Sequence, residues 1–158
     1  MNKLIFIAIF SMAFADGYSQ TYNHSQLIGT KWITTWGYRR ISGSTKTNLG
    51  FSKYVGTLEF TNSEMKESYY IEYSYIRPPK EHNLRPNKYK TSLIDYNDPY
   101  YLSPSVPTTF DSLKVGDSRC SGNYVVYKNK YNKTEHMQIV TLNDSVLILG
   151  SYHYRRIK

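Results

Sequence analysis

Few side chains in this sequence could perform catalysis or hold a metal, and their spacing indicates no known site. The four histidines, His24, His82, His136 and His153, lack the H-x-x-x-H spacing of paired metal ligands. His136 and His153 fall on the two arms of the last predicted hairpin, so its register could bring them together. A two-histidine site would still need another ligand and supporting hydrogen bonds. We therefore interpret all four as surface or partly buried side chains, and we expect no metal ion.

The carboxylates and serines do not indicate hydrolytic chemistry either. Glu67 and Glu72 are predicted on opposite faces of one strand, which argues against a two-carboxylate hydrolase. The sequence contains neither the Gly-x-Ser-x-Gly motif of a serine nucleophile nor a glycine-rich phosphate-binding loop. We expect a protein that is not an enzyme and that uses no cofactor.

The single cysteine, Cys120, has no partner for a disulfide within the chain. We interpret it as a small buried apolar side chain rather than a nucleophile. The stability of the fold must then come from packing and hydrogen bonds.

The sequence is basic, with 20 Lys and Arg against 12 Asp and Glu, a formal net charge of +8 and an isoelectric point near 9.4. Such a balance is typical of proteins that bind nucleic acids or acidic membrane surfaces. The basic residues are, however, spread along the whole chain in ones and twos, as in Arg39-Arg40 and Arg155-Arg156. We interpret them as solvated charges that discourage association between strands, and we expect no nucleic-acid partner.

The first 20 residues have the pattern of a cleaved export signal. Lys3 precedes an apolar run from Leu4 to Phe10, and Ala13-Phe14-Ala15 offers the small residues of a cleavage site near residues 15–20. The run is too short to span a bilayer, so we expect no integral membrane segment after cleavage. We predict an exported protein, periplasmic or secreted, with one domain over residues 21–158.

Apolar and polar residues alternate with a period of two along most of the remaining chain, which predicts an all-β fold. Proline-rich stretches at residues 77–87 and 97–107 are predicted to be irregular loops. Because short turns join most strands in sequence, we predict an antiparallel up-and-down barrel of about eight strands, with a β-sandwich as the alternative. The predicted strands are Trp32 to Ile41, Ser52 to Thr61, Met65 to Ile76, Lys88 to Tyr96, Thr108 to Val115, Ser121 to Lys128, Thr134 to Leu142 and Ser145 to Arg156.

The two ends of the chain carry a family resemblance. Leu27-Ile28-Gly29-Thr30-Lys31-Trp32 follows the export signal, Leu58-Glu59-Phe60 precedes the first tight turn, and a hairpin from Ile139 to Leu149 lies near the end. In these features the chain resembles bacterial lipocalin-like proteins of the calycin group. The resemblance implies that Trp32 plugs the closed end of the barrel beneath Arg155 or Arg156. The lipocalin signature has one residue between glycine and tryptophan, whereas this chain has Thr30 and Lys31 there.

A barrel of this size can hold one small ligand, and two hypotheses for the function follow. In the first, the protein binds a small apolar or amphipathic ligand, with the Pro78-Pro79 loop and residues 99–107 bordering the mouth. In the second, a filled barrel or sandwich presents the tyrosine-rich segment Asp95 to Leu102 as a surface for a protein or glycan partner. The alternation places these candidate ligand-binding residues on the inner face: Trp36, Tyr38, Tyr54, Leu58, Tyr69, Ile71, Tyr73 and Leu93.

Overall fold

The computed structural model describes residues 20–42, 48–75 and 88–158, and every structural statement below refers to these ranges. The predicted export signal, apart from its last residue, and the Pro78-Pro79 loop lie outside the described residues.

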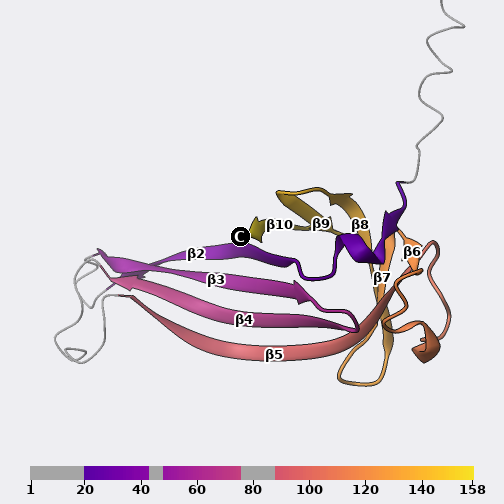
Figure 1. Cartoon of the computed structure of the whole chain (residues 1–158). Helices are drawn as coiled ribbons and strands as arrows, with labels where there is room; N and C mark the ends of the chain where they lie inside the picture. Colours follow the sequence, from indigo (N-terminus) through magenta and orange to yellow (C-terminus); the bar gives the residue numbers. More distant parts are fainter. Residues whose placement is uncertain (1–19, 43–47, 76–87) are drawn as a thin grey trace, which may run out of the picture.

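Eight antiparallel strands form a closed barrel (Figure 1), which confirms the predicted all-β barrel of about eight strands and excludes the β-sandwich. Consecutive strands are neighbours around the barrel, in the order β10-β2-β3-β4-β5-β7-β8-β9. The strands are β2 (Lys31–Ser42), β3 (Asn48–Phe60), β4 (Glu64–Tyr75), β5 (Lys88–Ser103), β7 (Tyr124–Lys128), β8 (Thr134–Leu142), β9 (Val146–Leu149) and β10 (Tyr152–Ile157).

The number of barrel strands agrees with the prediction although one predicted strand is absent, because another is divided into two. Thr108 to Val115 is not a strand, and contains only the short 3-10 helix η3 (Ser112–Lys114). The last predicted strand divides into β9 and β10 at Gly150, whose φ of 55° belongs to a turn.

The predicted loop at residues 97–107 is also wrong in its first half, because β5 continues to Ser103. Pro99 is tolerated within β5 because it lies where the strand changes neighbours. Residues up to Pro99 pair with β4, and those from Tyr100 onward pair with β7.

The barrel is closed along only part of its length, because its strands differ in length. β3 and β4 pair over eleven residues, whereas β5 and β7 pair over four and β10 and β2 over three. In Figure 1 the long strands β2 to β5 extend as a curved sheet well beyond the short strands β7 to β10. One end is therefore a complete barrel. At the other end β2 to β5 continue as a sheet, and we call the inner face of this extension the trough.

The closed end contains a continuous apolar core. The short sheet of β1 (Tyr22–Asn23) and β6 (Ser121–Gly122), together with the 3-10 helix η1 (His24–Gln26), contributes to this end. The core consists of Tyr22, Leu27, Trp32, Leu58, Phe60, Met65, Tyr100, Leu102, Val125, Ile139, Leu147, Leu149 and Tyr154.

Trp32 lies in this core with 0% of its surface exposed. Gly29, at φ 73°, makes the turn before β2, and its N–H donates to the Phe60 carbonyl at 2.8 Å. Thr30 is buried, and its Oγ1 accepts a hydrogen bond from Trp32 Nε1 at 2.7 Å. One of the two residues between glycine and tryptophan thus provides the acceptor that a buried indole N–H requires.

An arginine also lies over the indole ring of Trp32. Arg156 pairs directly with Trp32 across β10 and β2, and its guanidinium carbon lies 5.7 Å from the Trp32 ring centroid. Arg155 is the adjacent residue on β10 and pairs with Ile33, so it alternates to the other face.

His24 is a buried side chain, and its two ring nitrogens have no hydrogen-bond partner among the residues that the structure describes. Its ring lies 5.1 Å from that of Tyr100, and its backbone N–H donates to the Cys120 carbonyl at 3.1 Å. Burial lowers the pKa of His24 below its usual 6.5, and the nearby Asp117 carboxylate opposes this effect.

Replacement of Trp32 by alanine should lower the free energy of unfolding by ~3 to 5 kcal/mol, because it removes a fully buried indole from the core. Trp36→Ala is the matched control and should cost only ~1 kcal/mol, because Trp36 is 43% exposed. Denaturant titration measures both changes. A loss below ~1 kcal/mol for Trp32→Ala would contradict the role of this residue as the plug.

The stability of the protein should fall as the pH drops below 6.5, in part because of His24. A depressed pKa means that the folded state binds fewer protons than the unfolded state in this range, so acid favours unfolding. His24→Leu should remove this contribution, which is at most about 1.4 kcal/mol per pH unit, while the exposed control His153→Leu retains it. Denaturant titrations at pH 8, 6 and 5 test this, and equal pH slopes for His24→Leu and the unchanged protein would disprove it.

Candidate functional site

Six of the eight candidate ligand-binding residues share the inner face of the barrel. Leu58 is buried in the core, so alternate residues of β3 such as Tyr54 also face inward. The register places Trp36 and Ile71 beside Tyr54 on the neighbouring strands. The six are Trp36, Tyr54, Leu58, Tyr69, Ile71 and Tyr73.

Three of these residues form an aromatic cluster in the trough, above the core. The ring centroid of Trp36 lies 6.0 Å from that of Tyr54, and the two ring planes are stacked at 17°. The centroid of Tyr69 lies 5.9 Å from that of Trp36, in an edge-to-face arrangement with 78° between the planes. Gly56 lies beneath them, and a Cβ at this position would be 3.0 Å from Trp36 and 3.1 Å from Tyr69. The absence of a side chain at Gly56 therefore allows these two rings to meet.

Tyr38 and Leu93 are not on the inner face where the alternation placed them. The register between β2 and β3 shifts between Trp36 and Arg39, where Gly37 has a φ of 60°. Tyr38 is therefore 71% exposed, and its ring packs against Phe51 on the outer face. Leu93 is 48% exposed because the register of β5 also shifts, and Ile94 takes the place opposite Tyr69. Each shift adds one residue and reverses the facing of those beyond it.

The segment Asp95 to Leu102 does not form the exposed tyrosine surface of the second hypothesis. Tyr100 and Tyr101 are buried, because this part of β5 pairs with β7 at the closed end. The Tyr100 hydroxyl donates to the Thr61 carbonyl at 2.9 Å, and Tyr101 packs on Phe110 at 5.3 Å.

A gap in the strand pairing creates an opening in the barrel wall. Lys88–Pro99 of β5 pairs with β4 on one side, but in the described part of the chain it has no strand partner on the other. We call this gap, bounded by β5 and the β7–β8 loop at residues 129–133, the seam. Two hollows of about 170 and 530 Å³ lie along it and share Tyr96, Asp98, Asn129 and Lys130.

The smaller hollow contains three carboxylates from three different strands: Glu67 on β4, Asp98 on β5 and Glu135 on β8. The register places Glu67 opposite Tyr96, on the inner face. Glu67 accepts a hydrogen bond from the Tyr69 hydroxyl at 2.8 Å, and Glu135 accepts one from the Tyr127 hydroxyl at 3.2 Å. This tyrosine–carboxylate cluster is continuous with the aromatic cluster, because Tyr69 belongs to both.

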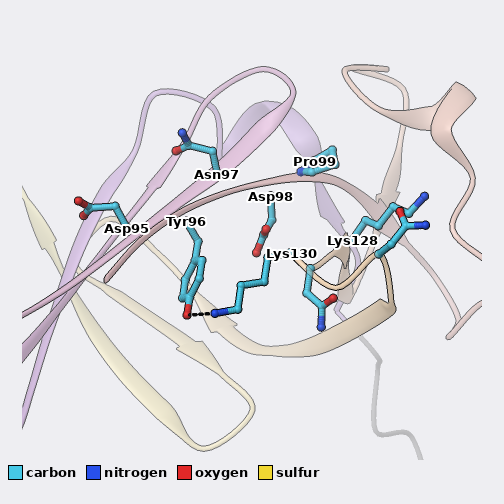
Figure 2. A pocket seen from close by; sticks show the side chains of 9 residues that line it. Asp95, Tyr96, Asn97, Asp98, Pro99, Lys128 and Lys130 are labelled. Carbon is cyan, nitrogen blue, oxygen red and sulfur yellow. Dashed lines mark hydrogen bonds between the residues drawn. The ribbon is translucent and has the colours of Figure 1, made fainter. Parts of the chain in front are cut away.

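Asp98 differs from the other two carboxylates in its lack of a hydrogen-bond or ion-pair partner among the described residues. It is 7% exposed, and its carboxylate makes no hydrogen bond or ion pair with any side chain in the described ranges. In Figure 2 Asp98 and Tyr96 project from β5 toward Lys130, whereas Asn97 points the opposite way. The Asp98 side chain therefore points into the hollows.

The electrostatics of the cluster disfavour negative charge. Burial raises the pKa of Glu67, the charges of Asp98 and Glu135 raise it further, and the Tyr69 hydroxyl opposes both effects. Burial and the Glu135 charge also raise the pKa of Asp98. The pKa values of Tyr69 and Tyr127 are raised, mainly by burial, so both remain neutral hydrogen-bond donors.

Lys130 stands at the rim of the hollows between two tyrosine rings. Its Nζ donates to the Tyr96 hydroxyl at 3.1 Å, and lies 4.9 Å and 5.0 Å from the ring centroids of Tyr96 and Tyr131. Figure 2 shows the bond to Tyr96.

The sequence prediction did not include Glu67, Asp98 or Glu135 in the site. A signal for Glu67 was present, because it occupies an inward position between Met65 and Tyr69 in the most regular of the predicted strands. Asp98 fell in a stretch predicted to be irregular, so its facing could not be assigned.

Comparisons with known proteins place this barrel in no family. No protein-family model matches the chain, and no match was found among curated proteins or among solved structures.

In the described ranges, no helix has both the length and the apolar character needed to cross a membrane.

Neutralising Glu67 should stabilise the fold at neutral pH. Because the pKa of Glu67 is raised, the folded state binds its proton more strongly than the unfolded state does. Ionised Glu67 therefore lowers the free energy of unfolding, and this loss is complete only above the raised pKa. Glu67→Gln should therefore raise the free energy of unfolding at pH 8, with a gain that shrinks as the pH falls toward 4.5. Chemical denaturation across this pH range measures the effect.

Glu72→Gln provides the matched control on the same strand. Glu72 pairs with Lys53 at 3.3 Å, so its replacement should cost up to ~1 kcal/mol rather than stabilise. If Glu67→Gln lowers the free energy of unfolding at pH 8 as Glu72→Gln does, the negative charge of Glu67 does not destabilise the fold.

Proposed function

We propose that this protein is an exported, lipocalin-like carrier that binds a small amphipathic molecule inside the barrel and does not catalyse a reaction. The observation that carries the proposal is a chain of contacts on the inner face: Trp36 packs against Tyr69, and Tyr69 donates a hydrogen bond to Glu67, which lines a hollow of about 170 Å³. A wall that is apolar at one end and polar at the other suits a ligand with the same division.

The aromatic cluster would hold the apolar part of the ligand. Trp36 is 43% exposed although it faces inward, since β7 to β10 do not cover the trough. A partly exposed tryptophan flanked by Tyr54 and Tyr69 offers a large apolar area at little cost in conformational entropy. Burial of this surface by a ligand would provide the main favourable free energy of binding.

The polar end favours binding over catalysis. Tyr69 and Tyr127 hold Glu67 and Glu135 by hydrogen bonds, and their raised pKa values keep them protonated. Groups fixed in this way can orient a ligand, and they do not include an activated nucleophile. The apolar run and small residues at the start of the sequence support export, as expected for a carrier of external small molecules.

Protein purified without detergent from the exporting cell should carry a small molecule, visible as a mass increment in native mass spectrometry and recoverable by solvent extraction. Trp36→Ala should greatly reduce the fraction with the increment, because it removes the central ring of the trough. Tyr38→Ala is the control, since Tyr38 is an aromatic of the same strand on the outer face.

A clean mass for the unchanged protein, together with no binding of fatty acids, sterols or alkylamines, would overturn the proposal. An increment that both variants retain equally would place the ligand outside the trough and would also overturn it.

A further inference from the structure

We propose that the small hollow at the seam binds the protonated head group of a primary amine, so that the ligand of the barrel is an alkylammonium amphiphile. The inference rests on the proposed function and adds the chemical class of the ligand. The geometry that points to it is the Asp98 side chain, which lines the hollow and has no ion pair or side-chain hydrogen bond within the described ranges, beside two other carboxylates and three tyrosine rings.

Asp98 is the central group. Asp98 as a whole residue is 7% exposed, and its carboxylate faces the hollows. A carboxylate in such a place normally has hydrogen-bond donors or a cation beside it, because its removal from bulk water without either is costly. In the described ranges Asp98 has neither, and it lines both hollows. A primary ammonium brings a positive charge and three N–H donors, whereas a quaternary ammonium brings no donor.

The other two carboxylates make the hollow selective for a cation. Glu67 and Glu135 reach it from β4 and β8, so three of the 12 acidic residues of a chain with net charge +8 face one small space. Burial raises the pKa of Glu67 and of Asp98, and repulsion by neighbouring carboxylates raises both further. A bound cation relieves this repulsion, whereas an anion increases it.

Tyrosine rings complete the environment of the cation. Tyr96, Tyr127 and Tyr131 line the hollow, and ring faces attract ammonium groups. The protein already contains one such contact, because the primary ammonium of Lys130 lies about 5 Å from the ring centroids of Tyr96 and Tyr131. In the described ranges Lys130 forms no ion pair with the three carboxylates, so the place beside Asp98 is left for a second ammonium.

The amine must also carry an apolar chain. Glu67 in the hollow accepts the hydrogen bond of Tyr69, whose ring packs edge-to-face with that of Trp36 in the trough. A chain that leaves the ammonium site along Tyr69 therefore passes directly onto the aromatic cluster. An amine with an apolar chain should bind more tightly than a small polar amine, because it buries this aromatic surface.

The test compares four octyl probes by isothermal titration calorimetry at pH 7.5, with protein purified from the exporting cell and freed of any extractable ligand. Octylamine should bind about 10- to 100-fold more tightly than 1-octanol, because it adds a charged hydrogen bond to Asp98. Octanoate should bind more weakly than octanol, and octyltrimethylammonium more weakly than octylamine.

Asp98→Asn tests the assigned carboxylate, with Asp95→Asn as its matched control. Asp95 is three residues away on the same strand and exposed, and it lines only the larger, outer hollow. Asp98→Asn should lower the affinity for octylamine about tenfold or more and leave that for octanol unchanged, which also shows that the variant is folded. Asp95→Asn should leave both affinities unchanged.

The outcomes separate this inference from the proposed function. If octanol or octanoate binds as tightly as octylamine, the barrel binds amphiphiles but the amine assignment is overturned. Equal binding of octyltrimethylammonium, or equal effects of Asp98→Asn and Asp95→Asn, would overturn it as well. If no octyl probe binds and the purified protein carries no small molecule, the proposed function itself fails.

Discussion

The burial of Trp32 is the constraint on which the rest of the structure depends. An indole in a core needs an acceptor for its N–H, and Thr30 provides it within the same segment. Arg156 covers the ring from the last strand, so the beginning and the end of the barrel meet at this one side chain. Because the core at this end is complete, strands β2 to β5 can extend beyond it without a covering layer. The site lies in that extension and in the wall beside it.

The alternation of the sequence predicts the strands well and their facing less well. It places Trp36, Tyr54 and Tyr69 together on the inner face, and the structure shows them in contact. It fails for Tyr38 and Leu93, because one added residue in β2 and one in β5 reverse the facing of their neighbours. Gly37 hints at the first shift, but nothing in the sequence around Leu93 marks the second. Such shifts depend on how neighbouring strands pair, which the local pattern does not encode.

The carboxylate cluster escaped prediction for a related reason. Glu67, Asp98 and Glu135 are distant in the sequence, and they meet only because the barrel closes around the seam. The cluster should lower the stability of the fold, because carboxylates of like charge lie together in a partly buried space. Sites that bind ligands commonly show such a conflict between stability and function, and it distinguishes this hollow from the well-satisfied core around Trp32.

The unpaired edge of β5 has a further consequence for the dynamics of the molecule. Within the part of the chain that the structure describes, the backbone groups of Lys88–Pro99 that face the seam lack the second row of strand hydrogen bonds found in β3 and β4. The molecule should therefore not open as one cooperative unit. Amide protons of β5 near the seam should exchange with solvent through small local fluctuations, whereas those around Trp32 should wait for global unfolding. We therefore expect the barrel wall beside the seam to open and close on a faster timescale than the closed end, which keeps the fold intact.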